Sequence, residues 1–256
     1  MNFFFSIHYN DLKSRLAIPR FQNKALPDYN YLLYSAVIKN NKWIINNEDN
    51  KNNSKNFFLL DNDNLSNEKI FFLATKEQIE KIETLSLSKL LRLNKYTSTT
   101  PDYRANLRVY LDYQGFSSYQ SEYPSEMINK KGGILSSVSS LANIKAEKNL
   151  LILKNIYEEP IQDQFSIFFV DIKNKIKLSQ QIIYTNRTNV IEINKDLIRP
   201  ETYIITEKYL AVPIYLSIDK GHLSMEHTHP LHEYIADESK YSKVSEFKKI
   251  VNEIIR

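Results

Sequence analysis

The sequence contains no cysteine among its 256 residues. Disulfide bonds, thiol nucleophiles and zinc or iron–sulfur sites built on cysteine are therefore excluded. No apolar run approaches the roughly 18 residues that a membrane-spanning helix requires, and residues 1–7 lack the basic start and apolar core of a signal peptide. We therefore expect a soluble, cytoplasmic protein without membrane association.

Glycine is also scarce, because the chain holds only Gly115, Gly132, Gly133 and Gly221. The Gly-rich loops that cradle nucleotide phosphates need several glycines at fixed spacing, and neither the dinucleotide-binding nor the P-loop pattern is present. We therefore expect no nucleotide cofactor bound by these devices.

The sequence also lacks a large excess of either sign of charge, since it has 34 basic and 30 acidic residues and a formal net charge of +4. Nucleic-acid binding needs a clustered basic excess, whereas the groupings Lys130-Lys131 and Lys248-Lys249 are short. We expect no nucleic-acid partner.

A content of 42% hydrophobic and 25% charged residues is typical of a globular chain of one large or two small domains.

The first hundred residues predict an N-terminal α+β region over 1–100. Apolar runs within 29–45 predict a hairpin, and 57–60 and 70–73 predict two further strands. Residues 46–56 contain no apolar side chain and predict a mobile loop. Thr75 and Gln78 form a capping-box pattern before a helix over about 76–93.

Residues 101–256 predict an antiparallel β-sandwich-like or barrel-like region, because short apolar runs recur between polar clusters. The expected strands are 107–111, 150–156, 165–172, 182–184, 190–193, 203–205 and 210–218. Pro213 predicts an edge position or a bulge, and 244–255 predicts an amphipathic C-terminal helix that packs over the sheet. The fold class is thus mainly β (α+β), with the two regions either separate or continuous as one domain.

Four of the five histidines lie within eleven residues: His222, His227, His229 and His232. Asp219-Lys220-Gly221 predicts a three-residue turn with glycine in the left-handed conformation, so His222 begins a return strand. On a strand, His227 and His229 share one face and lie about 6.5 to 7 Å apart, which lets both imidazoles bind one metal ion.

Pro230 ends this strand, and the following loop can carry His232 or Glu233 to the same point. The expected metal ligands are His227, His229 and Glu233, and this donor set suits zinc, iron or manganese. Glu226 faces the other way, and with His232 it is a candidate catalytic residue. Two alternatives stay open: a histidine acts as general base without metal, oriented by Glu226 or Glu233, or the histidines are structural or surface residues.

Gly221, five intervening residues, His227-Thr228-His229, three more residues and Glu233 together resemble the first half of the cupin metal motif. That resemblance implies a small β-barrel that holds iron, manganese, nickel or zinc. It covers thirteen residues, and Lys240 stands where the motif has a further glycine. No histidine follows His232 to supply the second half of the motif, so we make no family assignment.

Residues 112–124 are dense in hydroxyls, amides and aromatic rings, a mixture that lines pockets for polar ligands such as sugars. The candidate substrate-binding residues here are Arg104, Arg108, Tyr119 and Glu122. The alternative is a long surface connection whose tyrosines pack on the core.

Two functions follow as hypotheses. The first is a divalent-metal-binding β protein that acts on a small polar substrate through the histidine cluster. The second is a non-catalytic β-sandwich that recognises a glycan or a protein partner, with structural histidines and an aromatic contact surface.

Overall fold

A computed structural model of the chain describes residues 2–10, 12–20, 31–48, 54, 56–80, 105–111, 115–121, 123–124, 128, 134–206, 212–227, 249–250 and 252–255. Every strand pairing in these ranges is antiparallel. The helix α1 (Lys76–Glu80) has five residues, and no helix in the described ranges is long and apolar enough to cross a membrane. The chain is therefore mainly β, as its sequence predicts.

The contacts divide the chain into two units. The first comprises residues 1–128, 156–162 and 186–188, and the second comprises 129–155, 163–185 and 189–256. By these contacts the first unit runs to residue 128, and two short later segments return to it.

Hydrogen bonds explain why these later segments belong to the first unit. The indole nitrogen of Trp43 donates to the carbonyl oxygen of Glu158 at 2.9 Å, and the Thr188 hydroxyl donates to the Ser6 carbonyl oxygen at 2.9 Å. The Asn186 side chain donates to the carbonyl oxygens of Glu159 and Ile161. Because buried backbone groups need such partners, these bonds fix both segments.

The first unit contains a three-stranded sheet, a four-stranded sheet and one two-stranded pair. The first sheet has the order β4 (Lys42–Asn47), β3 (Leu32–Lys39), β6 (Ile70–Ala74). The second has the order β5 (Phe57–Asp61), β2 (Lys13–Pro19), β7 (Ala105–Leu111), β8 (Gly115–Ser121). β1 (Asn2–Phe3) pairs with β9 (Tyr123–Pro124), and the 3₁₀ turn η1 spans Asn62–Asn64.

The predicted N-terminal hairpin is confirmed as β3 and β4. Asn40 and Asn41 form its two-residue turn with φ of 52° and 55°, the left-handed values that a type I′ turn needs and that asparagine tolerates. The runs 57–60 and 70–73 are strands, as predicted, but they belong to different sheets, since β5 pairs with β2 and β6 with β3.

The predicted helix start at Thr75 is confirmed as a reciprocal capping box. The Thr75 backbone N–H donates to the Gln78 side-chain oxygen at 2.8 Å, and the Gln78 N–H donates to the Thr75 hydroxyl oxygen at 3.2 Å. Two of the N–H groups left open at the helix start are satisfied in this way. The rest of the helix expected over 76–93 lies outside the described residues.

The expected mobile loop over 46–56 is wrong at its start. Residues 46 and 47 lie in β4, and Glu48 is buried. The Glu48 carboxylate accepts hydrogen bonds from the Ser35 hydroxyl and the Lys69 ammonium group, both at 2.7 Å. A paired and hydrogen-bonded carboxylate tolerates burial. The prediction of a mobile loop was based on composition alone and missed these two partners.

The second unit contains two four-stranded sheets. One has the order β10 (Ile134–Ser137), β15 (Thr202–Thr206), β12 (Gln164–Asp171), β13 (Ile176–Tyr184). The other has the order β14 (Thr188–Glu192), β11 (Lys148–Lys154), β16 (Val212–Asp219), β17 (His222–His227). The 3₁₀ turns η3 (Val138–Ser140) and η4 (Lys195–Leu197) complete it. Neither described sheet closes on itself, so the barrel alternative is wrong.

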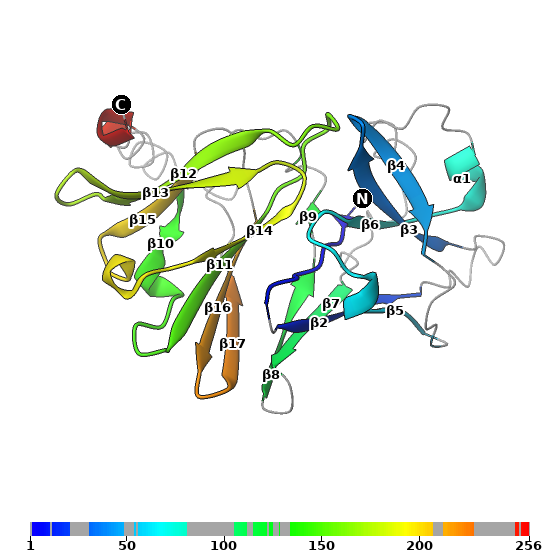
Figure 1. The fold of residues 1–256 in the computed structure, drawn as a ribbon, viewed down its shortest axis with the longest axis horizontal. Coiled ribbons are helices and arrows are strands. Elements are labelled where there is room, and N and C mark those ends of the chain that lie inside the picture. The colour runs from blue at the N-terminus through cyan, green and yellow to red at the C-terminus, as the bar shows by residue number, and fades with distance from the viewer. Residues whose placement is uncertain are drawn as a thin grey trace, which may run out of the picture. The chain divides into compact units, whose positions relative to one another are not determined.

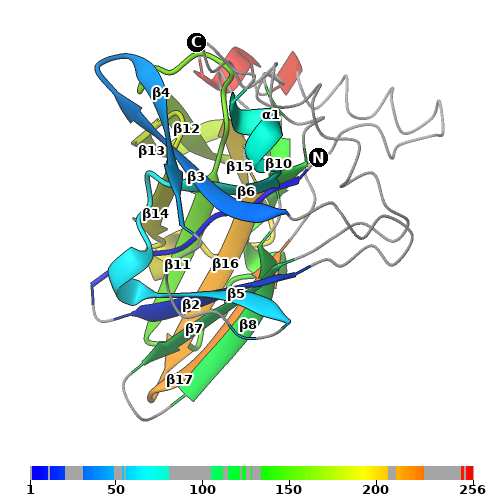
Figure 2. The ribbon, with the colours of Figure 1, turned by 90° about the vertical axis from the view of Figure 1, so that its right-hand side faces the viewer.

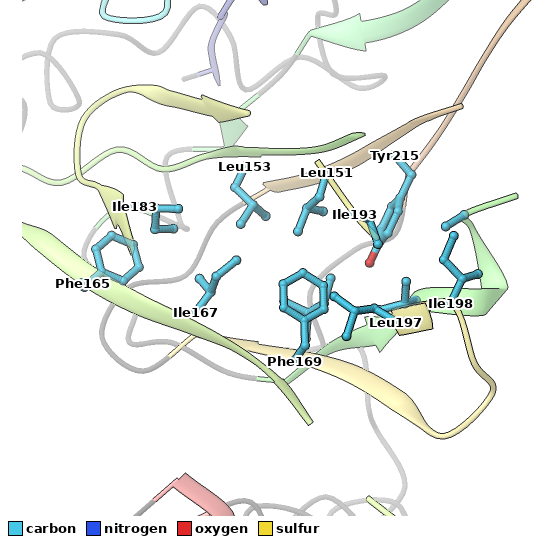
Figure 3. Close-up of a cluster of buried hydrophobic side chains, with 13 residues drawn as sticks. Leu151, Leu153, Phe165, Ile167, Phe169, Ile183, Ile193, Leu197, Ile198 and Tyr215 are labelled. Carbon is cyan, nitrogen blue, oxygen red and sulfur yellow. The ribbon is translucent and has the colours of Figure 1, made fainter. Parts of the chain in front are cut away.

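One hydrophobic cluster joins side chains of both sheets. Figure 3 shows Leu151, Leu153 and Tyr215 pointing toward Phe165 and Phe169, so the side chains of the two sheets interdigitate. Alternation places these residues on one face of each strand. Burial of this apolar area supplies most of the stabilisation of the unit.

Pro213 does not mark an edge strand, which corrects the prediction from sequence. β16 lies between β11 and β17. Pro213 is the second residue of β16 and lies one position beyond Ile214, the last residue that pairs with β17. A proline at the start of a strand removes few ladder hydrogen bonds, so an inner strand tolerates it there.

The C-terminal helix is described at residues 249–250 and 252–255. Ile254 and Ile255 pack against a second hydrophobic cluster formed by Phe168, Val170 and Ile205. These residues belong to β12 and β15, so the end of the helix covers that sheet, as its apolar stripe predicts.

Candidate functional site

The histidine cluster begins in a tight hairpin between β16 and β17. Asp219 pairs with His222, so the turn contains only Lys220 and Gly221, one residue fewer than the sequence predicts. Their φ values are 48° and 77°, which identify a type I′ turn. Figure 1 shows the two strands side by side at the end of their sheet. The return strand starts at His222, as predicted.

The described histidines of β17 lie on opposite faces. His222 and Glu226 are exposed, and Glu226 pairs with Tyr215. His227 is half-buried on the same face as Met225, which is 7% exposed. The period of two that the sequence predicts is confirmed up to His227, and Glu226 projects away from it.

The other members of the expected metal site, His229, His232 and Glu233, lie outside the described residues. In the part of the chain that the structure describes, no group of three or more His, Cys, Asp and Glu side chains could hold a metal ion. The metal site therefore stays a hypothesis that rests on His227 and its extended strand.

His8, the fifth histidine, lies in the first unit. Its side chain is exposed, and its backbone N–H and carbonyl oxygen exchange hydrogen bonds with the Asn67 side chain at 2.8 and 2.7 Å. The contacts of Asn67 thus hold the backbone at His8.

The polar segment 112–124 is a strand over most of its length, which corrects the expected binding loop or surface connection. β8 spans Gly115–Ser121 and pairs with β7 over seven residues. Ser121 is buried, and its hydroxyl exchanges hydrogen bonds with the backbone of Phe5. Tyr123 is fully buried, and this burial raises the pKa of its phenol above the usual range.

Two of the four expected substrate-binding residues, Arg108 and Tyr119, lie in the described part of the chain. Arg104 and Glu122 lie outside the described residues. Arg108 pairs with Ser118, whereas Tyr119 pairs with Leu107, so Arg108 and Tyr119 project from opposite faces of the sheet. A single pocket on one face of this sheet cannot include both side chains.

Arg108 instead belongs to an exposed surface that we call the cationic face. It consists of six neighbouring side chains on one face of β2, β7 and β8: Lys13, Arg15, Arg108, Tyr110, Phe116 and Ser118. Figure 2 shows β5, β2, β7 and β8 side by side. The residues that alternate with them on β2 and β7 point to the other face of the sheet and are fully buried. They are Ser14, Leu16, Leu107 and Val109.

The central contact of the cationic face is a stack of Arg108 on Phe116. The guanidinium carbon lies 4.4 Å from the ring centroid, within the range of a cation–π interaction. Phe116 is 60% exposed, the most exposed of the large apolar side chains described. Among the described residues, no carboxylate forms an ion pair with Arg108, and the ring of Phe116 is its recorded contact.

Arg15 is held differently from Arg108. Its Nε atom donates to the Asp61 carboxylate at 2.5 Å, and this hydrogen bond raises the pKa of the Arg15 guanidinium. Arg15 and Arg108 are directly opposite on β2 and β7. The Asp61 carboxylate thus offsets the repulsion between two neighbouring cations.

Lys13, Arg15 and Phe116 are not among the candidate residues predicted from the sequence. Lys13 and Arg15 alternate with Ser14 and Leu16, a local signal of an exposed strand face. Phe116 gives no such signal, because its place beside Arg108 depends on the register between β8 and β7.

Comparisons of the chain with protein-family models, with curated proteins and with solved structures found no match. The function is therefore inferred from the side chains of this chain alone.

Proposed function

We propose that the protein is a non-catalytic recognition module that binds a partner molecule on the cationic face. The observation that carries this proposal is the exposed stack of Arg108 on Phe116, in which the guanidinium group has no carboxylate partner among the described residues. Arginine and aromatic side chains dominate the energy of recognition surfaces.

The sheet supports this role because it holds the two side chains in place. Arg108 lies between the buried residues Leu107 and Val109, and β7 is paired on both sides, with β2 and β8. A ligand that binds such a surface loses little free energy to ordering it. In this proposal, the second unit is a β-sandwich, because side chains of its two sheets share one core cluster.

The test uses arrays of immobilised glycans and proteins, probed with the labelled full chain. The double variant Arg108→Ala/Phe116→Ala should lose the binding that the parent shows. The matched control is Lys177→Ala/Ile182→Ala, which removes one cation and one side chain of similar exposure, 59%, from the second unit. Equal binding by the parent and the Arg108→Ala/Phe116→Ala variant would refute the proposal.

A divalent-metal site that includes His227 is the second candidate function. It is supported by the extended backbone of β17 up to His227 and by the half-buried position of that side chain. His227 and His229 would be ligands, with Glu233 or His232 completing the site and zinc, iron or manganese as the ion.

Elemental analysis of protein purified without a histidine tag tests this second candidate. The parent and a His222→Ala variant should carry near-stoichiometric metal, because His222 lies on the opposite face of β17 from His227. His227→Ala/His229→Ala should carry none. Metal at the same level in all three proteins, or in none, contradicts the metal site.

A further inference from the structure

We infer that the chain forms a symmetric dimer through the outer edge of β13, with a second copy of itself as the partner. The outer edge is the side of residues 179–183 that faces away from β12. This surface belongs to the second unit, whereas the cationic face belongs to the first. Three features favour the dimer: the open backbone of the edge, its exposed side chains and the match between two copies of the strand.

The backbone of the outer edge has no neighbouring strand. β13 is the last strand of its sheet in the described part of the chain. Among the described residues, the hydrogen bonds of residues 179–183 all go to β12, including the one from the Gln180 side chain to the Ser166 hydroxyl at 2.9 Å. Alternate residues of an antiparallel strand point their N–H and C=O groups away from the paired neighbour. The outer edge therefore offers donors and acceptors to another strand.

Exposed side chains mark the same segment. Gln180, Gln181 and Ile182 are three consecutive exposed residues. Because successive side chains of a strand point to opposite faces, neither face is covered there. The edge strands β8 and β17 instead alternate exposed side chains with more buried ones. Ile182 is 59% exposed, so its burial against a partner is favourable.

The features that protect edge strands from pairing lie at one end of β13. Lys177 is its one charged residue, and the ammonium group lies 5.5 Å from the centre of the Phe168 ring of β12. Leu178 is the extra residue of a β-bulge at the same end. Charged residues and bulges hinder edge pairing. Residues 179–183 contain no charge, no bulge and no proline, so the pairing surface begins after the bulge.

Two copies of this segment match when they pair antiparallel about a two-fold axis at Gln181. Symmetry then places Gln181 opposite its own copy, where the two side-chain amides exchange hydrogen bonds. Gln180 lies opposite Ile182 of the second copy, and the two Ile182 residues become diagonal neighbours about 7 to 8 Å apart at their backbones. Each exposed Ile182 side chain therefore covers the other. The strand is complementary to itself, which favours a second copy over an unrelated protein.

The charge of β13 fits the antiparallel arrangement. Lys177 lies outside the paired segment, so the two copies of Lys177 are about 27 Å apart at a strand rise of roughly 3.4 Å per residue. A parallel, in-register pair would place them on adjacent strands about 4.8 Å apart, where like charges repel. Charge thus selects the two-fold arrangement, in which one surface serves both chains.

Sedimentation velocity of the full chain from about 1 µM to about 1 mM tests the dimer. The parent should shift from monomer toward dimer as its concentration rises. Ile182→Lys should weaken dimerisation roughly tenfold or more, because it replaces an apolar contact by two like charges near the axis. The matched control is Ile144→Lys, which changes an isoleucine of similar exposure, 55%, outside the strands of the same unit. It should dimerise like the parent.

The absence of cysteine from the chain makes the position of the axis measurable by disulfide cross-linking. Gln181→Cys should form a covalent dimer on mild oxidation, because the two thiols lie on directly opposite residues. Lys177→Cys should cross-link roughly tenfold more slowly or not at all, since residues whose Cα atoms are more than about 7 Å apart cannot be bridged without backbone movement.

Three results would overturn the inference. The first is a monomer at every concentration. The second is a dimer that Ile182→Lys leaves as tight as the parent, because the contact then lies on another surface. The third is equal cross-linking of the Gln181→Cys and Lys177→Cys variants, which contradicts antiparallel pairing about Gln181. Matching circular dichroism spectra of parent and variants exclude misfolding as the cause of any loss.

Discussion

The β7–β8 and β16–β17 hairpins are built alike but present their polar side chains differently. Each pairs an inner strand with an edge strand. On β8 the exposed edge-strand face carries Phe116 against Arg108 of the inner strand. On β17 the exposed face carries His222 and Glu226, while His227 lies half-buried beside Met225.

The two hairpins differ in the exposure of their candidate residues: Arg108 and Phe116 are exposed, whereas His227 is half-buried. In the proposed function, a ligand would contact Arg108 and Phe116, both of which are exposed. His227 has lower exposure and lies on the side of β17 that also buries Met225. Such a position suits a structural side chain or a ligand to a small ion.

The largest expected effect on stability comes from replacing a buried leucine of each hairpin by alanine. Leu107 of β7 and Leu216 of β16 are both fully buried, and substitution of a buried leucine by alanine costs about 2 to 5 kcal/mol. Leu107→Ala should speed amide hydrogen exchange in β7 and β8, and Leu216→Ala should do so in β16 and β17. Exchange followed by mass spectrometry on peptides of each hairpin measures both effects.

The two leucine substitutions also test whether the hairpins depend on separate cores. Each lies in a different contact unit, so each should leave exchange in the other hairpin nearly unchanged. Equal acceleration in both hairpins by either substitution would contradict the separation.

A smaller effect is expected at the β16–β17 turn. Gly221 has a φ of 77°, where a Cβ atom costs roughly 1 to 2 kcal/mol. Gly221→Ala should therefore lower the unfolding temperature measured by calorimetry. Lys220→Gly is the control, because glycine accepts the 48° φ of that position without strain. An unchanged unfolding temperature in Gly221→Ala would show that the turn is not type I′.

Most strands were predictable because their signal is local. Short apolar runs between polar clusters located β11, β12, β15 and β16, and the pair Thr75 and Gln78 located the start of α1. Such patterns follow from the burial of strands in a core and from the chemistry of helix caps.

Strand pairing was not predictable from local patterns. The sheet that joins Leu16 to Leu107 depends on contacts between residues far apart in the sequence. β8 has few β-branched or large apolar residues and forms a strand through its pairing with β7. Glu48 is buried because Ser35 and Lys69 meet its carboxylate. Of the candidate site, the sequence predicted Arg108 but not the ring on which it stacks.

In the β12–β13 hairpin, one contribution to stability is expected to depend on pH. The Asp171 carboxylate accepts hydrogen bonds from the Asn174 backbone N–H at 2.9 Å and side chain at 2.8 Å, and these bonds lower its pKa below the usual 3.8. Because the folded-state pKa is the lower one, the stabilisation is present above pH 3.8 and is lost as pH falls through the folded-state value.

Unfolding temperatures of the parent and Asp171→Asn, measured from pH 7 to pH 2, check this expectation. The parent should be the more stable protein at pH 7, and the difference should shrink below about pH 4. A difference that stays constant over the whole range would show that the charge of Asp171 does not contribute.

The smallest effects on stability are expected on the exposed faces of the two edge strands. Glu226→Gln should change the free energy of unfolding by less than about 0.5 kcal/mol, as is usual for an exposed surface position. Phe116→Ala should cost no more than about 1 kcal/mol, because it removes one exposed cation–π contact. Denaturant unfolding measures both. If Phe116→Ala instead costs as much as Leu107→Ala, the ring is part of the core of the first unit, and the cationic face loses the exposed aromatic surface on which its ligand would lie.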